Sequence, residues 1–162
     1  MNLTDELTKI GNRKLFNSII QDLTLKQKHQ PEPLCLIMTD IDHFKSVNDT
    51  HGHHVGNEVL CEFALRLRQV AREQDVIARM GGEEFAILVS HNNSKEAVDA
   101  AERFRKAIDS SPFQTSAGEL KVRASFGVSS LSAELDLDET LKACDKALYD
   151  AKKSGRNCVK SS

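Results

Sequence analysis

Two adjacent glycines, Gly81 and Gly82, stand between two short apolar runs and constrain the fold of this chain more than any other stretch. The runs cover residues 76–80 and 85–89. A glycine pair between such runs predicts the tip of a β-hairpin. Glu83 and Glu84 follow the glycines, so the turn offers two carboxylates on a rigid platform suited to a divalent cation or a proton transfer. Taken alone, the stretch fits an ordinary solvated turn better than a site.

Length and composition exclude several classes of protein. At 162 residues the chain is expected to be one domain with a single core. Its 40% hydrophobic and 28% charged residues predict a soluble, globular protein. The formal net charge of −2 leaves no basic footprint, so a nucleic acid is not expected as a partner.

Cysteine usage and hydropathy indicate the compartment. The four cysteines are scattered without a CxxC pair and are interpreted as reduced core thiols: Cys35, Cys61, Cys144 and Cys158. No apolar run approaches ~18 residues and no signal-like start is visible, so contact with a membrane is not expected. We therefore expect a cytoplasmic protein.

Hydrophobic periodicity predicts the remaining elements. Helices are expected over residues 12–28, 57–70, 94–108 and from 136 to a stop at Gly155. Asn12 and Ser94 are the predicted N-caps of the first and third helices. A continuous apolar run over 34–39 predicts a central strand buried on both faces, whereas alternation over 120–128 predicts a strand with one solvated or partly covered face. The segment between the strand over 34–39 and the second helix, rich in Asn, Asp, Gly and His, is predicted to be a loop.

The order of these elements predicts the topology. Without the first and last helices it is βαββαβ, the ferredoxin-like arrangement of an α+β domain with a central antiparallel sheet flanked by helices. We expect one domain over residues 12–162, preceded by a lead segment, 1–11, that resembles the end of a linker.

That topology brings two acid clusters together. The first and third strands are antiparallel neighbours, so the end of one lies beside the start of the other. Asp40 and Asp42 leave the first strand there, and Glu83 and Glu84 enter the third. Carboxylates gathered at one sheet edge repel one another unless a cation lies between them, and Mg²⁺ with substrate phosphates is the usual solution.

Basic and amide-rich stretches near these acids suit a polyphosphate. Residues 44–48 form a segment rich in backbone N–H groups that includes Lys45. Lys152 and Arg156, four residues apart at the end of the last helix, could neutralise terminal phosphates. On their own, these two cations fit the helix dipole better.

Together these motifs resemble the GGDEF domains, the diguanylate cyclase family. Residues 81–85 read GGEEF, a form of the family signature. Similar motifs follow in three further segments: 7–13 for the opening motif, 40–53 for the substrate and metal segment, and 147–157 for the closing motif. Each motif alone is weak, but the set covers nearly the whole chain with compatible spacing.

The resemblance implies a reaction. Each domain would bind one GTP with Mg²⁺ or Mn²⁺, and two domains would face each other as a homodimer. The 3′-hydroxyl of each GTP would attack the α-phosphate of the other, giving cyclic di-GMP and two pyrophosphates. A sensor or dimerisation module, attached covalently or not, is the further partner that the resemblance implies.

The resemblance also implies residue roles. Metal ligands would be Asp40, the Ile41 carbonyl and Glu83. Catalytic residues would be Glu83 as proton acceptor, Lys45 and Glu84. Substrate contacts would come from Phe44, Lys45, Asn48, His53, Asn57, Lys152 and Arg156.

An RxxD segment, Arg72 to Asp75, lies where family members carry an inhibitory product site, and Arg103 is a candidate further contact. Arginine pairs with guanine acceptors and phosphate, and aspartate accepts guanine's N–H donors. The simpler alternative is a helix-end salt bridge between Arg72 and Asp75.

Departures from the family pattern leave alternatives open. Asn57 replaces an aspartate that accepts both donors of guanine's Watson–Crick edge, and mispairing there is worth on the order of 1–3 kcal/mol. The alternatives to a diguanylate cyclase are a cyclic dinucleotide synthase of altered specificity and a catalytically weak module that binds GTP or cyclic di-GMP. His54, for a usual aspartate, is taken as peripheral. Lys9, for a usual glycine, is expected to lie away from the chemistry.

Overall fold

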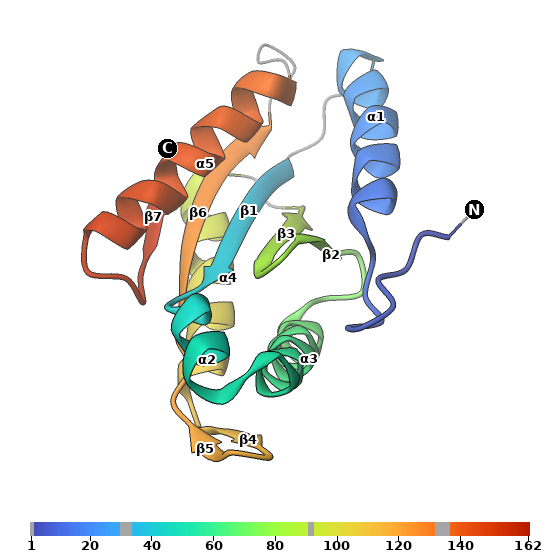
Figure 1. The fold of residues 1–162 in the computed structure, drawn as a ribbon. Coiled ribbons are helices and arrows are strands. Elements are labelled where there is room, and N and C mark those ends of the chain that lie inside the picture. The colour runs from blue at the N-terminus through green and yellow to red at the C-terminus, as the bar shows by residue number, and fades with distance from the viewer. Residues whose placement is uncertain (1, 30–33, 91–92, 132–136) are drawn as a thin grey trace.

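The computed structural model describes residues 2–29, 34–90, 93–131 and 137–162 (Figure 1). Its helices are α1 (Arg13–His29), α2 (Phe44–His51), α3 (His53–Val70), α4 (Ser94–Asp109) and α5 (Leu137–Lys153). Its strands are β1 (Leu34–Ile41), β2 (Val76–Gly81), β3 (Glu84–Val89), β4 (Phe113–Thr115), β5 (Gly118–Leu120), β6 (Ala124–Leu131) and β7 (Val159–Ser161).

The main sheet has the strand order β2-β3-β1-β6-β7, in which β1 pairs antiparallel with both β3 and β6. Helices α3 and α4 cover one face, and α1 and α5 cover the other (Figure 1). The predicted α+β, ferredoxin-like fold is therefore confirmed. The short strand β7, which extends the sheet parallel to β6, was not predicted.

Strand β1 forms the centre of the sheet, and all eight of its residues are buried. Cys35 and Ile37 pack toward α3 and α4, whereas Leu36 and Met38 pack toward α1 and α5. Burial on both faces explains the continuous apolar run in the sequence. The same alternation aims Asp40, the acid of this strand, at the side of the sheet that carries α5.

The loop prediction for the segment after β1 is wrong, because most of it is helical. Helix α2 begins at Phe44, and α3 begins at His53, four residues before the predicted start. Gly52, with φ 89°, separates the two helices and donates its N–H to the Asn48 carbonyl. Phe44 is buried in the core, so packing rather than the modest helix propensity of Asn, Asp and His decides the outcome.

Two N-caps were predicted, and one of them is wrong. Asn12 caps α1, since its Oδ1 accepts the N–H of Leu15 at 3.0 Å. Helix α4 is capped by Asn93 instead of Ser94: the Asn93 side chain accepts the N–H of Glu96 at 2.9 Å. Residue 136, the predicted start of the last helix, lies outside the described residues.

The strand predicted over 120–128 has wrong bounds and the wrong environment. Leu120 belongs to β5, which pairs with β4 in a separate hairpin, and β6 begins at Ala124. Ser125, expected on a solvated face, is fully buried. Strand β6 is covered on both faces, most closely at Gly127, where an added Cβ would lie 2.4 Å from the Leu148 nitrogen of α5.

A buried arginine anchors the β4–β5 hairpin to the body of the domain. The Arg66 side chain is 10% exposed and donates to four backbone carbonyls at the junction of α4 and β4. Its guanidinium carbon lies 4.1 Å from the centroid of the Phe113 ring. At the hairpin tip, Glu58 of α3 accepts the N–H and the hydroxyl of Ser116. The hairpin is therefore held beside α3 at both ends.

The N-terminal segment packs against β2. Ile10 is buried in the core, Gly11 bridges to Ala78, and the N–H of Arg79 donates to the Gly11 carbonyl at 2.9 Å. The predicted domain boundary after residue 11 stays a prediction. No helix in the described part of the chain is long and apolar enough to cross a membrane.

Candidate active site

Asp40 and Glu84 are cross-strand partners in the β1–β3 ladder. The antiparallel register therefore brings the two acid segments together, as the sequence predicted. Glu83 is bonded to β1 through its backbone, because its carbonyl accepts the N–H of Ile41 at 3.4 Å. Asp40, Ile41 and Glu83, the predicted metal ligands, thus lie at one point of the sheet edge.

Asp40 is the most buried acid of the site, at 8% exposure. Its Oδ2 accepts a hydrogen bond from Lys152 Nζ, whereas its Oδ1 is buried without a partner among the described residues. Burial raises the pKa of Asp40, the charges of Glu83 and Asp42 raise it further, and Lys152 opposes the shift. A buried carboxylate oxygen without a donor is destabilising, and a bound cation would satisfy it.

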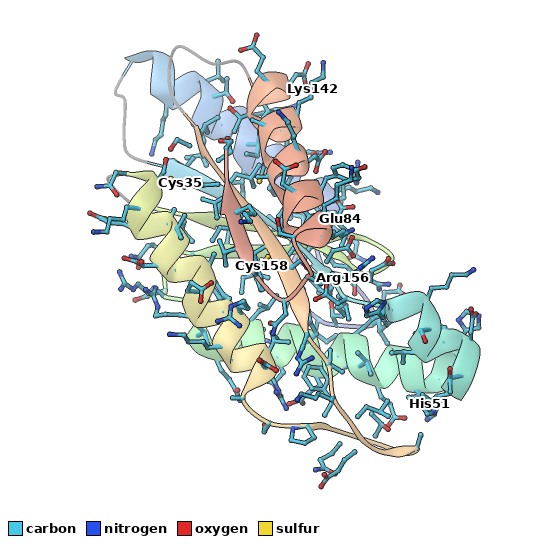
Figure 2. The ribbon with its side chains drawn as sticks, turned by 90° about the vertical axis from the view of Figure 1, so that its left-hand side faces the viewer. Cys35, His51, Glu84, Lys142, Arg156 and Cys158 are labelled. Atoms are coloured by element: carbon cyan, nitrogen blue, oxygen red, sulfur yellow. The ribbon has the colours of Figure 1, made fainter. Side chains whose placement is uncertain are left out.

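Glu84 lies half-buried beside α5 (Figure 2). Burial raises its pKa, and the negative charges of Asp145 and Asp40 act in the same direction. Lys152 and Arg13 partly offset these effects. The end of β1 and the start of β3 thus gather several carboxylates around Lys152. Such a group of acids suits a ligand that brings its own cation.

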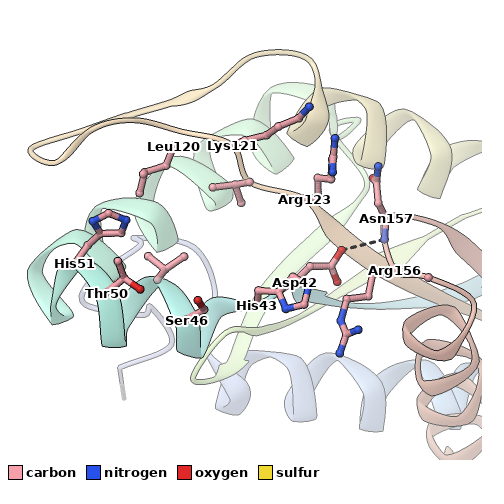
Figure 3. Close-up of a pocket in the computed structure, with 13 residues that line it drawn as sticks. Asp42, His43, Ser46, Thr50, His51, Leu120, Lys121, Arg123, Arg156 and Asn157 are labelled. Carbon is pink, nitrogen blue, oxygen red and sulfur yellow. Dashed lines mark hydrogen bonds between the residues drawn. The ribbon is translucent and has the colours of Figure 1, made fainter.

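Asp42, which the sequence placed in the same acid cluster, is held by two hydrogen bonds just after β1. Its Oδ1 accepts the Ser125 hydroxyl at 2.7 Å, and its Oδ2 accepts the Asn157 N–H at 2.9 Å (Figure 3). The side chain therefore ties the end of β1 to β6 and to the turn after α5. That turn also carries Arg156, a predicted phosphate contact.

The oxygen atoms at the end of β1 and the start of β3 fit a metal site with few protein ligands. In the ranges that the structure describes, no three His, Cys, Asp or Glu side chains converge on a common metal position. Two carboxylates, from Asp40 and Glu83, and the Ile41 carbonyl match the preference of Mg²⁺ for a small number of protein oxygens completed by substrate and water. The residues present therefore fit the implied metal.

The predicted nucleoside contacts lie on α2 and at the start of α3. Asn48 of α2 lies directly against Gly56 of α3, since an added Cβ at Gly56 would lie 1.8 Å from Asn48 Oδ1. Asn57 follows Gly56 and is exposed, as are His53 and Lys45. The absence of a side chain at Gly56 thus leaves room for the Asn48 side chain, a contribution that was not predicted.

A cavity of about 370 Å³ lies on the other side of α2 (Figure 3). It is bounded by α2, by residues 120–123 and by the turn of residues 155–157. His43, Arg156 and Asn157 all have positive φ, at 57°, 64° and 46°. Residues other than glycine rarely adopt this left-handed conformation. Three of them around Asp42 indicate a backbone that the surrounding contacts hold in place.

The signature hairpin is braced by residues that the sequence analysis did not single out. Arg79 Nε donates to the Gly82 carbonyl at 2.9 Å, and its guanidinium pairs with Asp5 at 3.4 Å. Arg13 Nε donates to the Met80 carbonyl at 3.1 Å. In the sequence, these contacts were indicated only by an arginine two residues before the glycine pair and by an arginine at the start of the first helix. These bonds fix the tip from which Glu83 projects.

The RxxD segment borders a separate pocket of about 460 Å³. Asp75 Oδ2 accepts the backbone N–H of Arg72 at 2.9 Å, so the carboxylate closes the turn through the main chain. Arg72 is exposed, and its side chain lines the pocket. Arg103 lies on the exposed face of α4 and is not among the residues that line this pocket, so its role stays a prediction.

These features define a GGDEF domain. The model of the diguanylate cyclase GGDEF domain matches residues 2–158, and the chain belongs to this family. The response regulator PleD of Caulobacter vibrioides is 41% identical over 160 residues, which are 97% of this chain and 35% of PleD. The chain thus spans about a third of that relative.

Solved structures agree with this assignment. The GGDEF domain of DgcB from Caulobacter crescentus, in complex with c-di-GMP, has 30% identity and a TM-score of 0.92, covering 98% of this chain and 92% of that chain. The active GGEEF domain of a diguanylate cyclase from Vibrio cholerae has 32% identity and a TM-score of 0.84, covering 99% and 97%.

Proposed function

We propose that this domain synthesises cyclic di-GMP from two molecules of GTP as a metal-dependent diguanylate cyclase. The observation that carries the proposal is the Asp40 carboxylate: one oxygen is buried without a partner among the described residues, and the ladder partner is Glu84 of the GGEEF hairpin. Family membership supplies the reaction class. Four free cysteines support a reducing compartment, so we place the reaction in the cytoplasm.

Asp40, the Ile41 carbonyl and Glu83 would hold Mg²⁺ or Mn²⁺. When bound, the metal neutralises phosphate charge and polarises the reacting phosphoryl oxygen. Burial raises the pKa of Asp40, which disfavours its charged form. A cation bound beside Asp40 would stabilise the charged carboxylate and offset this effect. Lys152 supplies that charge in the free chain through its hydrogen bond to Oδ2.

Two such domains would face each other, each presenting one GTP. Glu83, on the braced hairpin tip, accepts the proton of the attacking 3′-hydroxyl. The bond from O3′ to the α-phosphorus forms while the bond to the bridging oxygen breaks, and pyrophosphate leaves with its electron pair. Lys45 stabilises charge in the transition state, and Lys152 and Arg156 hold the terminal phosphates. A second transfer closes the ring.

Base recognition would fall to Asn48, His53 and Asn57, beside Phe44 in the core. An Asn57 amide offers guanine one acceptor where two are needed, so we propose that guanine selectivity is weakened and that mixed nucleotide substrates give hybrid product. The exposure of Asn57 at the α2–α3 junction supports this proposal. A separate sensor or dimerisation module would bring the two domains together.

The RxxD pocket would bind the cyclic di-GMP product and inhibit synthesis. Its volume of about 460 Å³ and the exposed Arg72 support a second nucleotide site. Together with Asn57, this pocket also favours a second candidate function, a weakly catalytic module that binds GTP or cyclic di-GMP.

The test is product analysis by mass spectrometry after incubating concentrated protein with Mg²⁺ and equimolar GTP and ATP. We expect cyclic di-GMP with some hybrid product, a shift to cyclic di-GMP alone in Asn57→Asp, and no product in Glu83→Gln. Nucleotide binding without any product at every protein concentration would favour the binding module. Cyclic di-GMP as the sole product of the native chain would refute the selectivity proposal.

A further inference from the structure

Lys9, at a position where the family usually has glycine, lies in the wall of the RxxD pocket. It is one of the residues lining the same cavity of about 460 Å³ as Arg72 and Asp75. Its side chain is exposed, and its φ is 66°. Most residues other than glycine avoid this left-handed conformation, because it brings Cβ too close to the following carbonyl oxygen. The chain therefore carries a lysine at a backbone position suited to glycine.

The backbone around Lys9 is held by specific contacts. Its N–H donates to the Asp5 carbonyl at 2.9 Å, and the Asp5 N–H donates to the Ile10 carbonyl at 2.8 Å. Ile10 is buried, and the next residue, Gly11, is bonded to Arg79 of β2. This closed turn fixes Lys9 on one wall of the pocket, next to the strand that follows Asp75.

The charges of the pocket favour an anionic occupant. Three cationic side chains line it, from Lys9, Arg68 and Arg72, against two acids, Glu73 and Asp75. One oxygen of Asp75 is already engaged by the Arg72 N–H. A ligand with two phosphodiester groups and guanine N–H donors matches such a lining, since cations bind the phosphates and a carboxylate oxygen accepts from the base.

We propose that Lys9 is a phosphate contact of this second site, adding an ammonium group to the Arg72–Asp75 segment. The inference rests on the proposed product site and names a residue of it that the RxxD pattern does not contain. The strained backbone at position 9 is then retained by the ligand contact that its side chain makes.

Isothermal titration of cyclic di-GMP into the full chain, without GTP, tests the proposal. We expect Lys9→Met, which removes the charge and keeps a long side chain, to weaken binding about tenfold. Lys9→Gly should weaken it similarly and leave stability equal or higher, because glycine adopts the left-handed conformation freely. Lys14→Ala, an exposed lysine of α1 outside the pocket lining, is the matched control and should bind like the native chain. Raising the salt concentration should shrink the difference between the native chain and Lys9→Met.

The outcomes separate this inference from the proposed site itself. Binding that is lost in Arg72→Ala but unchanged in Lys9→Met overturns the role of Lys9 and leaves the product site standing. A loss in Lys9→Gly without one in Lys9→Met also overturns it, because the effect then belongs to the backbone. Binding that is absent, or indifferent to Arg72→Ala, refutes the product site and the inference together.

Discussion

Lys152, near the end of α5, is hydrogen bonded to Asp40 at the end of β1. The contact joins the last helix to the central strand, and it places a cation against the most buried carboxylate of the site. In the free chain, burial raises the pKa of Asp40, and Lys152 opposes this rise. Nucleotide binding is therefore expected to alter the ion pair that Lys152 and Asp40 already form.

We expect Lys152→Met to lower the free energy of unfolding by about 1–3 kcal/mol without divalent cations, because Asp40 is then left buried with no donor. Urea unfolding should show that adding Asp40→Asn to Lys152→Met costs much less than Asp40→Asn does alone. Lys146→Met, an exposed lysine of the same helix, is the control. Strictly additive losses would mean that the two side chains do not interact.

Gly56→Ala should impair nucleotide binding without impairing the fold. The new Cβ would lie 1.8 Å from Asn48 Oδ1 and 3.3 Å from Phe44 Cζ, so the Asn48 side chain has to rotate away while the Phe44 ring shifts by only a few tenths of an ångström. Alanine is also the better helix former. We expect about a fivefold to tenfold weaker Kd for a non-hydrolysable GTP analogue by calorimetry, with unchanged or higher stability. Because the effect acts through Asn48, the double variant with Asn48→Ala should bind no worse than Asn48→Ala. Additive losses would contradict this mechanism.

Asp5 should make stability depend on pH. Burial raises its pKa, but hydrogen bonds from Thr8 and the charge of Arg79 outweigh burial and lower the pKa below its usual value. A carboxyl group whose pKa is lower when folded stabilises the fold above its unfolded pKa, near 4, and loses this contribution as the pH falls through the folded value. We expect Asp5→Asn to be about 1 kcal/mol less stable at pH 7, with the gap closing below about pH 3.

Urea unfolding at several pH values measures this gap. Glu6→Gln, the neighbouring exposed acid, should show little difference from the native chain at any pH. A gap between Asp5→Asn and the native chain that stays constant down to pH 3 would show that the carboxylate charge plays no part.

The parts of the fold that the sequence revealed are those with one dominant pattern. The glycine pair between apolar runs identified the β2–β3 hairpin, and the continuous apolar run identified β1. Helix α2 was missed because eight residues of loop-like composition are helical only through packing of Phe44 and Val47 on the core. Strand β7 was missed because three residues leave no periodicity to detect.

The contacts of the candidate site also divide into those that a sequence pattern predicted and those that it could not predict. The antiparallel topology alone predicted that the two acid segments would lie side by side, and the register pairs Asp40 with Glu84. The bonds of Asp42 to Ser125 and Asn157 were invisible, because they depend on a third strand and on a turn with two left-handed residues. Lys9 was set aside for a similar reason: only the folded turn brings it to the pocket of Arg72.

Gly127 bears on how this domain can be recombined with its relatives. The backbone of α5 lies so close to β6 that an added Cβ would be 2.4 Å from the Leu148 nitrogen and 2.5 Å from the Cys144 carbonyl. The absence of a side chain at Gly127 therefore lets α5 pack closely against β6. From this close position Lys152 reaches Asp40. A chimaera that takes α5 from this chain keeps the ion pair only where the recipient strand has glycine at the facing position.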